Sequence, residues 1–193
     1  MNNIIKNEIQ SRFFRACKSG NIEVINLITS TSMMENPDYT LDYFTLSEGF
    51  RWACLYGQLP VVQYLLTSPK FAYHVDIHTK NDSGFMNACK AGQLEIVKYL
   101  VESPELKDHV NIHTQNNEGI YWAFQKKQQK ILEYFIFELK MPLSKNIETY
   151  IEKNIFDIYW ANKIKQLFNS QAQYEQLHLK LANKNDEHSV IKI

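Results

Sequence analysis

The chain has 193 residues, of which 45% are apolar and 22% charged, and this composition indicates a folded protein rather than a disordered one. Its 21 lysines and arginines balance 21 aspartates and glutamates, and no region of the sequence breaks that balance. Nucleic-acid and anionic-membrane partners usually require a basic excess, so we expect neither.

The sequence repeats itself with a period of 35 residues. Three stretches align without a gap, at 46–80, 81–115 and 116–139, and an earlier copy of the same pattern begins at residue 13. All six glycines occupy two positions of the repeat, and all three cysteines occupy a third position: Gly49, Gly84 and Gly119; Gly20, Gly57 and Gly92; Cys17, Cys54 and Cys89. Such self-similarity predicts an array in which each unit packs against its neighbours.

Within each copy we predict two short helices joined by a tight turn. In the third copy, apolar residues at helical spacing (85–89) precede Gly92, and a second apolar stripe follows at 94–101. We assign all six glycines to turns, where a positive φ favours glycine. The polar segments HVDIHTKNDSG (74–84) and HVNIHTQNNEG (109–119) are predicted to be hairpin-like loops between copies.

These copies resemble the ankyrin repeat. FRWACLYGQLPVVQYLL (50–66) and FMNACKAGQLEIVKYLV (85–101) are similar to the family's L-x-x-A-A-x-x-G-H-x-x-V-V-x-x-L-L run, and 76–79 and 111–114 are similar to its D-V-N-A loop. The family's T-P-L-H helix start is absent and the period is 35 rather than 33, as in the divergent arrays of bacteria and large DNA viruses. The resemblance covers 13–139 and implies an all-α ankyrin-repeat solenoid of helix–turn–helix units with short hairpin-like loops.

We predict a single domain with four clear repeats and a helical C-terminal cap. Its parts are an N-terminal capping repeat (1–45), two repeats (46–80 and 81–115), a degenerate repeat (116–141) and the cap (142–193). The fourth copy departs from the repeat pattern, because Lys127 occupies the position of the turn glycine. In the cap, helices are predicted at 144–153, 155–168 and 171–182.

Two paired histidines suggest a metal site at first sight. His74 and His78, and likewise His109 and His113, are four residues apart, which on a helix would place both rings on one face. The alternation at 75–77 predicts extended chain instead, which separates the rings by about 13 Å. We therefore expect no metal and no cofactor, and we expect His78 and His113 to bond the backbone of the next loop.

We predict no catalytic or ligand-binding role for the cysteines and glycines. The three cysteines are expected on the inward face of the first helices, where a buried thiol is inert. No nucleophile–base arrangement and no phosphate-binding glycine motif stands out, so we expect no enzymatic activity.

No segment is predicted to be a targeting signal or a membrane span. The first ten residues carry charges, and the most apolar stretch, 131–139, is short and contains two glutamates. Three cysteines are an odd number and a poor start for a disulfide framework. We expect a protein of the producing cell's cytoplasm, with secretion as an effector as the alternative.

The resemblance implies a protein-interaction module, monomeric before it binds, that holds a partner protein in a concave groove lined by first helices and loop tips. The alternatives are an immunity or inhibitor protein that neutralises a bacterial toxin, and an effector whose activity lies in the C-terminal quarter. Carried over position by position, the helix contacts are Arg51, Leu55, Tyr56, Met86, Lys90, Tyr121, Gln125 and Lys126, and the loop-tip contacts are Thr79, Lys80, Asp82, Thr114, Gln115 and Asn117. Arg51, Tyr56 and Tyr121 are the expected hot spots, because aromatic and arginine side chains carry most interface energy.

Overall fold

The computed structural model describes residues 2–35, 41–71, 75–142, 145, 147–149, 162–173, 175, 176 and 179. Every regular element in these residues is a helix, as an all-α fold requires. The chain forms two compact units, Met1–Ile131 and Leu132–Ile193, with the boundary inside the fourth copy. The division into one domain with the repeat bounds given above stays a prediction.

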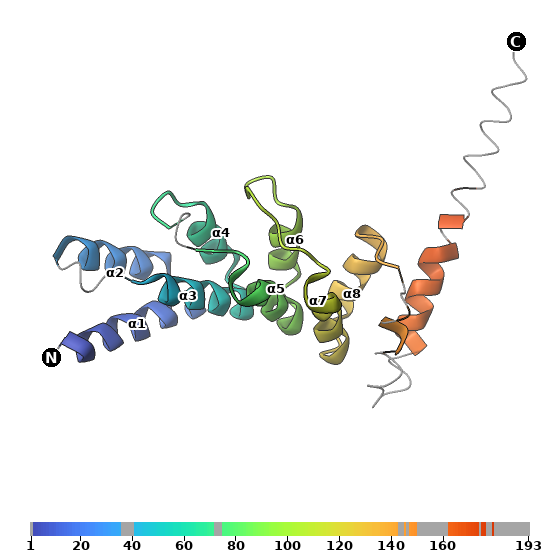
Figure 1. Ribbon diagram of the computed structural model, residues 1–193, viewed down its shortest axis with the longest axis horizontal. Helices are drawn as coiled ribbons and strands as arrows, with labels where there is room; N and C mark the ends of the chain where they lie inside the picture. The colour runs from blue at the N-terminus through green and yellow to red at the C-terminus, as the bar shows by residue number, and fades with distance from the viewer. Residues whose placement is uncertain are drawn as a thin grey trace, which may run out of the picture. The chain divides into compact units, whose positions relative to one another are not determined.

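In Met1–Ile131 the helices alternate between two rows (Figure 1). The first helices of the copies are α1 (Asn2–Ser19), α3 (Tyr43–Tyr56), α5 (Thr79–Ala91) and α7 (Thr114–Gln125), and each packs on the next. The second helices are α2 (Ile22–Glu35), α4 (Leu59–Thr67) and α6 (Leu94–Glu102), each packed on its own first helix, while α8 (Gln129–Glu133) follows α7. The predicted helix–turn–helix units are therefore confirmed.

A repeated pattern of burial on the first helices forms the core. Three positions of each first helix are 6% exposed or less: Phe13, Ala16 and Cys17; Phe50, Ala53 and Cys54; Phe85, Ala88 and Cys89; Ile120, Ala123 and Phe124. Burial raises the pKa of all three cysteine thiols, so these groups stay protonated and act as small apolar side chains. Each buried aromatic ring contributes about 1.5–3 kcal/mol to folding.

One set of glycines forms the turns between paired helices, as predicted. Gly20, Gly57 and Gly92 have φ of 78°, 77° and 80°, values that a side chain makes costly. A glutamine that follows the turn of the next copy covers each of them: Gln58 Nε2 donates to Lys18 O (2.9 Å), Gln93 Nε2 to Leu55 O (3.4 Å) and Gln128 Nε2 to Lys90 O (3.0 Å). These bonds tie the carbonyl end of one first helix to the following copy.

The other set of glycines corrects the sequence analysis, which assigned them to turns. Gly49, Gly84 and Gly119 lie inside α3, α5 and α7. A Cβ atom at Gly84 would lie 2.5 Å from Cε1 of Phe50, and one at Gly119 would lie 2.6 Å from Cε1 of Phe85. Glycine is needed here for space, because the phenylalanine of the preceding copy packs directly on the helix backbone.

The segment before α5 also differs from the extended chain that we predicted. Asp76 Oδ1 accepts a hydrogen bond from the backbone N–H of His78 (2.8 Å), and Asp76 O accepts one from Thr79 N (3.1 Å), so the chain turns here. The helix α5 then begins at Thr79, inside the stretch 74–84 that we predicted as a loop, and its first turn is kinked, with left-handed φ of 49°, 56° and 59° at Lys80, Asn81 and Asp82. The longer loops after α4 and α6 protrude on the side of the second helices (Figure 1).

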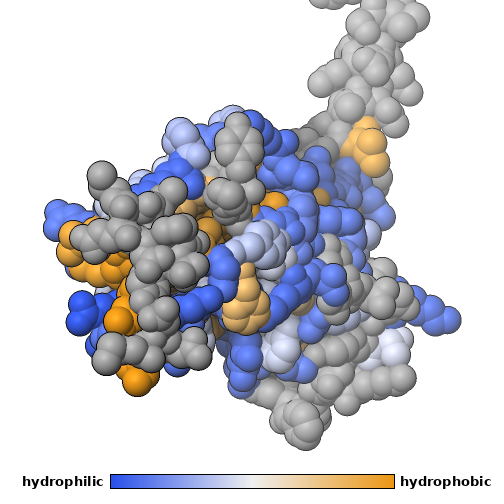
Figure 2. All heavy atoms as spheres, turned by 60° about the vertical axis from the view of Figure 1, so that its left-hand side comes forward, coloured by the Kyte–Doolittle hydropathy of each residue, from blue (hydrophilic) through white to orange (hydrophobic). Residues whose placement is uncertain are grey.

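The outer surface is mostly polar, with local exceptions. On the face shown in Figure 2, hydrophilic residues cover most of the coloured surface, and apolar residues gather at its left side. The first helix pair exposes Ile4 (76%) and Leu27 (67%), although a capping unit is expected to present a polar outer side.

The second unit, Leu132–Ile193, starts with a π-helical segment, Tyr134–Glu138, whose Tyr134, Phe135 and Ile136 are buried. Parts of the three predicted cap helices are helical, at 145, 147–149, 162–168, 171–173, 175, 176 and 179, and their remainder lies outside the described residues. The helix also includes 169 and 170, so the break that we predicted between the second and third cap helices is wrong. Ile147, Ile164 and Phe168 are buried. None of the described helices has the length and apolar character needed to cross a bilayer.

Candidate functional site

One face of the first helices points away from the core in every copy. We call it the first-helix face and define it by sixteen positions: 14, 15, 18 and 19; 51, 52, 55 and 56; 86, 87, 90 and 91; 121, 122, 125 and 126. None of these residues is buried, whereas the intervening core positions all are. The face therefore carries side chains that the core does not need.

The eight predicted helix contacts all lie on this face. Tyr56 is 50% exposed, Gln125 and Lys126 are exposed, and the other five are partly exposed: Arg51, Leu55, Met86, Lys90 and Tyr121. The structure thus brings together residues from α3, α5, α7 and the turn after α7, as the 35-residue register implied.

Two tryptophans of this face were missed by the sequence analysis. Lys18 Nζ lies 3.8 Å from the ring centroid of Trp52, and Lys90 Nζ lies 4.4 Å from that of Trp122. Tyr56 packs beside Trp52, with ring centroids 6.0 Å apart. The two lysine–tryptophan pairs occupy equivalent positions, because lysine of one copy covers tryptophan of the next.

The predicted loop-tip contacts are less uniform. Lys80 is exposed, forms an ion pair with Glu48 of the preceding first helix, and lies 5.1 Å from the ring of Phe44. Thr79 and Asp82 are only 9% and 3% exposed, so the expectation that they stand at an open tip is wrong. Asn117 is partly exposed, while the side chains of Thr114 and Gln115 lie outside the described residues.

Glu48 links the helix and loop-tip contacts electrostatically. Its carboxylate accepts a 2.6 Å hydrogen bond from Arg51 Nη1 and also pairs with Lys80. Burial raises the pKa of Glu48, but these two cations outweigh that effect and hold it below its usual value. Glu48 is therefore ionised and fixes both cations at the edge of the first-helix face.

A second polar cluster lies between successive loops, at His78. Its Nδ1 bonds Asp82 Oδ1 (2.6 Å) and its Nε2 bonds Asp108 Oδ2 (3.1 Å) in the loop of the next copy. Burial lowers the pKa of His78, but the hydrogen bonds and charges of the two aspartates outweigh it and raise the pKa above its usual value. The predicted bond to the next loop thus exists, through a carboxylate instead of the backbone.

The other histidines make different contacts, and the bond that we predicted from His113 to the backbone of the next loop is not the one that its ring makes. His113 Nδ1 bonds Asn117 Oδ1 (2.6 Å) within its own loop, and His109 Nε2 bonds Ser103 O (2.9 Å), whereas His74 lies outside the described residues. Within the described part of the chain, no group of three or more histidine, cysteine or acidic side chains is arranged so that it could hold a metal ion. A groove of about 480 Å³ runs between the loops, with Asp76, Ile77 and Asp108 among its walls.

The comparisons with known proteins agree with this architecture. A family model described as ankyrin repeats (3 copies) matches residues 50–147, slightly more than half of the chain. No curated protein and no solved structure matches. Ankyrin repeats are generally protein–protein interaction modules and are typically non-enzymatic. On the match to more than half of its length and on its stacked helix pairs, the chain belongs to the ankyrin repeat family.

Proposed function

We propose that the chain binds a partner protein through the first-helix face. The observation that carries this proposal is that the first helices use different positions for packing and for the surface. Twelve of their positions are buried in the core, and the sixteen positions of the first-helix face are not buried. Side chains on such a face vary without cost to the fold, so they are free to specify a partner. The groove implied by the ankyrin resemblance would run along this face.

The composition of the face suits protein recognition. Aromatic side chains occur in three of its four helices, as Phe14, Trp52, Tyr56, Tyr121 and Trp122. Half of the Tyr56 surface stays exposed, so contact with a partner would remove apolar area from water. Arg51 is already held by Glu48, which lowers the entropy lost when it binds.

The proposal is tested by measuring affinity after substitutions on the face. A partner identified by cross-linking in the source cell is titrated calorimetrically against Arg51→Ala, Tyr56→Ala and Tyr121→Ala. We expect each to cost about 1–2 kcal/mol, or about 5- to 30-fold in Kd. The combined variant loses more than any single one, and circular dichroism confirms that each variant is folded.

Matched controls lie on the second helices. Gln63 of α4 and Lys98 of α6 are partly exposed away from this face, so Gln63→Ala and Lys98→Ala leave affinity unchanged. Loss of affinity in these two variants together with unchanged affinity in the triple variant would place the partner on the second helices and refute the proposal.

A further inference from the structure

The charges of Met1–Ile131 are segregated in space, although they balance in sequence. Among the sixteen positions of the first-helix face, five are lysine or arginine and none is aspartate or glutamate. The five are Arg15, Lys18, Arg51, Lys90 and Lys126. Counting charges along the chain hides this excess, because the acids that balance it occupy the other positions of the repeats.

Three of these five cations form no ion pair with any residue that the structure describes. Arg51 pairs with Glu48 at 2.6 Å and Arg15 with Glu8 at 3.7 Å, each within its own helix. Within the described residues, no ion pair forms at Lys18, Lys90 or Lys126. The first two instead lie over Trp52 and Trp122 at 3.8 and 4.4 Å, an arrangement that orients an ammonium group without cancelling its charge.

Helix dipoles do not account for these lysines. Lys18 and Lys90 lie in the last turn of α1 and α5, where a cation complements the negative end of a helix. In this fold, however, the N-terminus of the second helix follows within a few residues, and its positive end offsets that field. The carbonyl groups Lys18 O and Lys90 O also accept bonds from Gln58 and Gln128.

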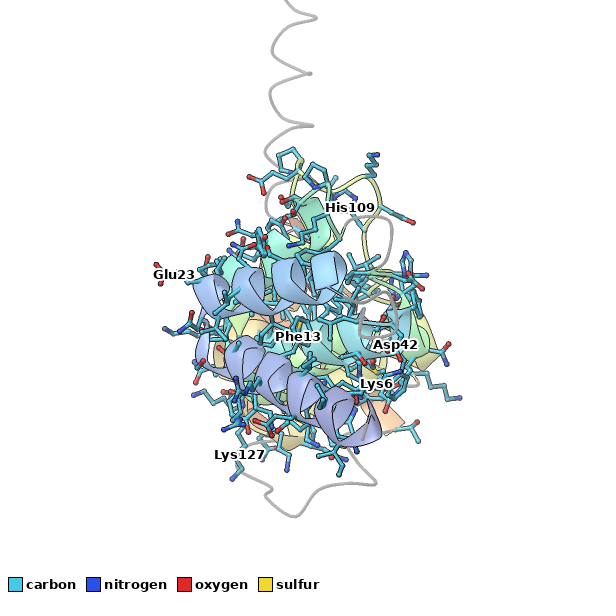
Figure 3. The ribbon with its side chains drawn as sticks, turned by 90° about the vertical axis from the view of Figure 1, so that its left-hand side faces the viewer. Lys6, Phe13, Glu23, Asp42, His109 and Lys127 are labelled. Atoms are coloured by element: carbon cyan, nitrogen blue, oxygen red, sulfur yellow. The ribbon has the colours of Figure 1, made fainter. Side chains whose placement is uncertain are left out.

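We infer that the partner presents an acidic polypeptide segment to the first-helix face, with carboxylates that meet Lys18 and Lys90; this inference rests on the proposed function. The loop that contains His109 lies away from the part of the face near Lys127. Figure 3 shows His109, in the loop that also carries Asp108, at the upper edge of the unit, and Lys127, which adjoins the face, at the lower edge.

The distance between Lys18 and Lys90 predicts how far apart the carboxylates of the partner segment lie. Lys18 and Lys90 belong to α1 and α5, two steps apart in the row of first helices. Helices pack at 8–10 Å, so the two ammonium groups are about 16–20 Å apart. An extended chain rises about 3.3 Å per residue, so the matching carboxylates are five or six residues apart.

A nucleic acid fits this face less well than an acidic polypeptide. Single strands bind by stacking bases on the open faces of aromatic rings. A lysine ammonium group already lies over one face of Trp52 and one face of Trp122, so a base that stacks there would first have to displace it. A carboxylate reaches the same ammonium groups without moving the rings.

The test is selection of peptides from a phage-displayed library of random dodecapeptides on the whole chain. We expect the enriched peptides to carry more aspartate and glutamate than the input library. Labelled copies of them should lose at least tenfold in affinity for Lys18→Ala/Lys90→Ala by fluorescence anisotropy. The matched control, Lys98→Ala/Lys107→Ala, removes the same charge from α6 and the following loop, and it changes affinity less than twofold.

The outcomes separate this inference from the proposed function. Enriched peptides that are neutral or basic but bind less to Tyr56→Ala would refute the acidic partner and leave the binding face intact. Peptides insensitive to every substitution on the face, or no enrichment at all, would refute both. A thymidine dodecamer that binds more tightly than the best peptide, and loses that affinity in Lys18→Ala/Lys90→Ala, would show that the ligand is a nucleic acid.

Discussion

The helix α5 packs against α3 on one side and α7 on the other, so the chain offers two junctions built from equivalent positions of successive copies. Both junctions place a phenylalanine ring against a glycine of the next helix, Phe50 at Gly84 and Phe85 at Gly119. Both also have a glutamine amide donating across the junction, from Gln93 and from Gln128.

Charged groups distinguish the two junctions. At the α5–α7 junction the His78 ring bridges Asp82 and Asp108 of the next loop. At the equivalent place of the α3–α5 junction, a neutral group, the Tyr43 hydroxyl, donates to Asp76 Oδ2 (3.2 Å). The steric contacts thus recur because close packing leaves little freedom, while the polar contacts vary from copy to copy. We expect perturbations of the steric contacts to have equal effects at the two junctions and perturbations of the charges to have unequal ones.

The largest effect is expected from filling the glycine positions inside the helices. Alanine in place of Gly84 or Gly119 gains helix propensity, but its Cβ meets the ring of Phe50 or Phe85 at 2.5 or 2.6 Å. Overpacking outweighs the gain, so each variant loses about 1–3 kcal/mol of unfolding free energy in urea titrations. The two losses should agree within experimental error.

Trimming the opposing ring provides the control. In a Phe50→Leu background the added Cβ of Gly84→Ala meets no ring, so Gly84→Ala should cause no further loss of unfolding free energy. In a Phe85→Leu background, Gly119→Ala should likewise cause no further loss. A Gly84→Ala variant as stable as the wild type would show that Phe50 does not pack on the helix backbone.

A smaller effect is expected at the turns after α5 and α7. Gly92 has φ 80° and Lys127, its counterpart in the fourth copy, has φ 56°. Gly92→Ala introduces a Cβ into the left-handed region and should cost about 1–2 kcal/mol, whereas Lys127→Gly should raise stability by a fraction of that. Thermal melts would shift by about 2–4 °C per kcal/mol, in opposite directions. Shifts of the same sign would mean that the fourth turn is built differently from the third.

The regular part of this architecture could be predicted from the sequence because it is periodic. The buried positions of α3 and α5, and the turn glycines Gly57 and Gly92, follow directly from the 35-residue register. Gly84 was misassigned because sequence does not show whether a glycine serves a positive φ or a close contact. The packing distance to Phe50, which decides between these roles, exists only in three dimensions.

The candidate site was predicted less completely for a related reason. Tyr56 and Lys90 were found by position within a copy, but the pairing of Lys18 with Trp52 joins different positions of two copies. Asp108 lies 30 residues after His78, a separation unrelated to the period, so nothing in the sequence marked it as a partner. Asp82 was expected at an open loop tip, yet its side chain is buried and forms a hydrogen bond with His78.

The smallest effect is a pH dependence confined to the His78 junction. The pKa of His78 is raised above its usual 6.5, so its stabilising contribution is complete below that pH and is lost as the pH rises through the folded-state value. The hydrogen bond from His78, with that from the His109 N–H, lowers the pKa of Asp108 below its usual 3.8. That contribution is present above pH 3.8 and is lost as the pH falls through the lowered value.

The charged link between the loops is therefore strongest between about pH 4 and 6.5 and weakens toward pH 8. Since His78 is partly exposed, the loss is below about 1 kcal/mol, measured as a small fall in Tm between pH 5.5 and 8. His78→Ala and Asp108→Asn should flatten that fall, whereas His113→Ala should leave it intact, because His113 faces an amide rather than a carboxylate. Equal flattening by His113→Ala would mean that the fall in Tm does not come from the link between His78 and Asp108.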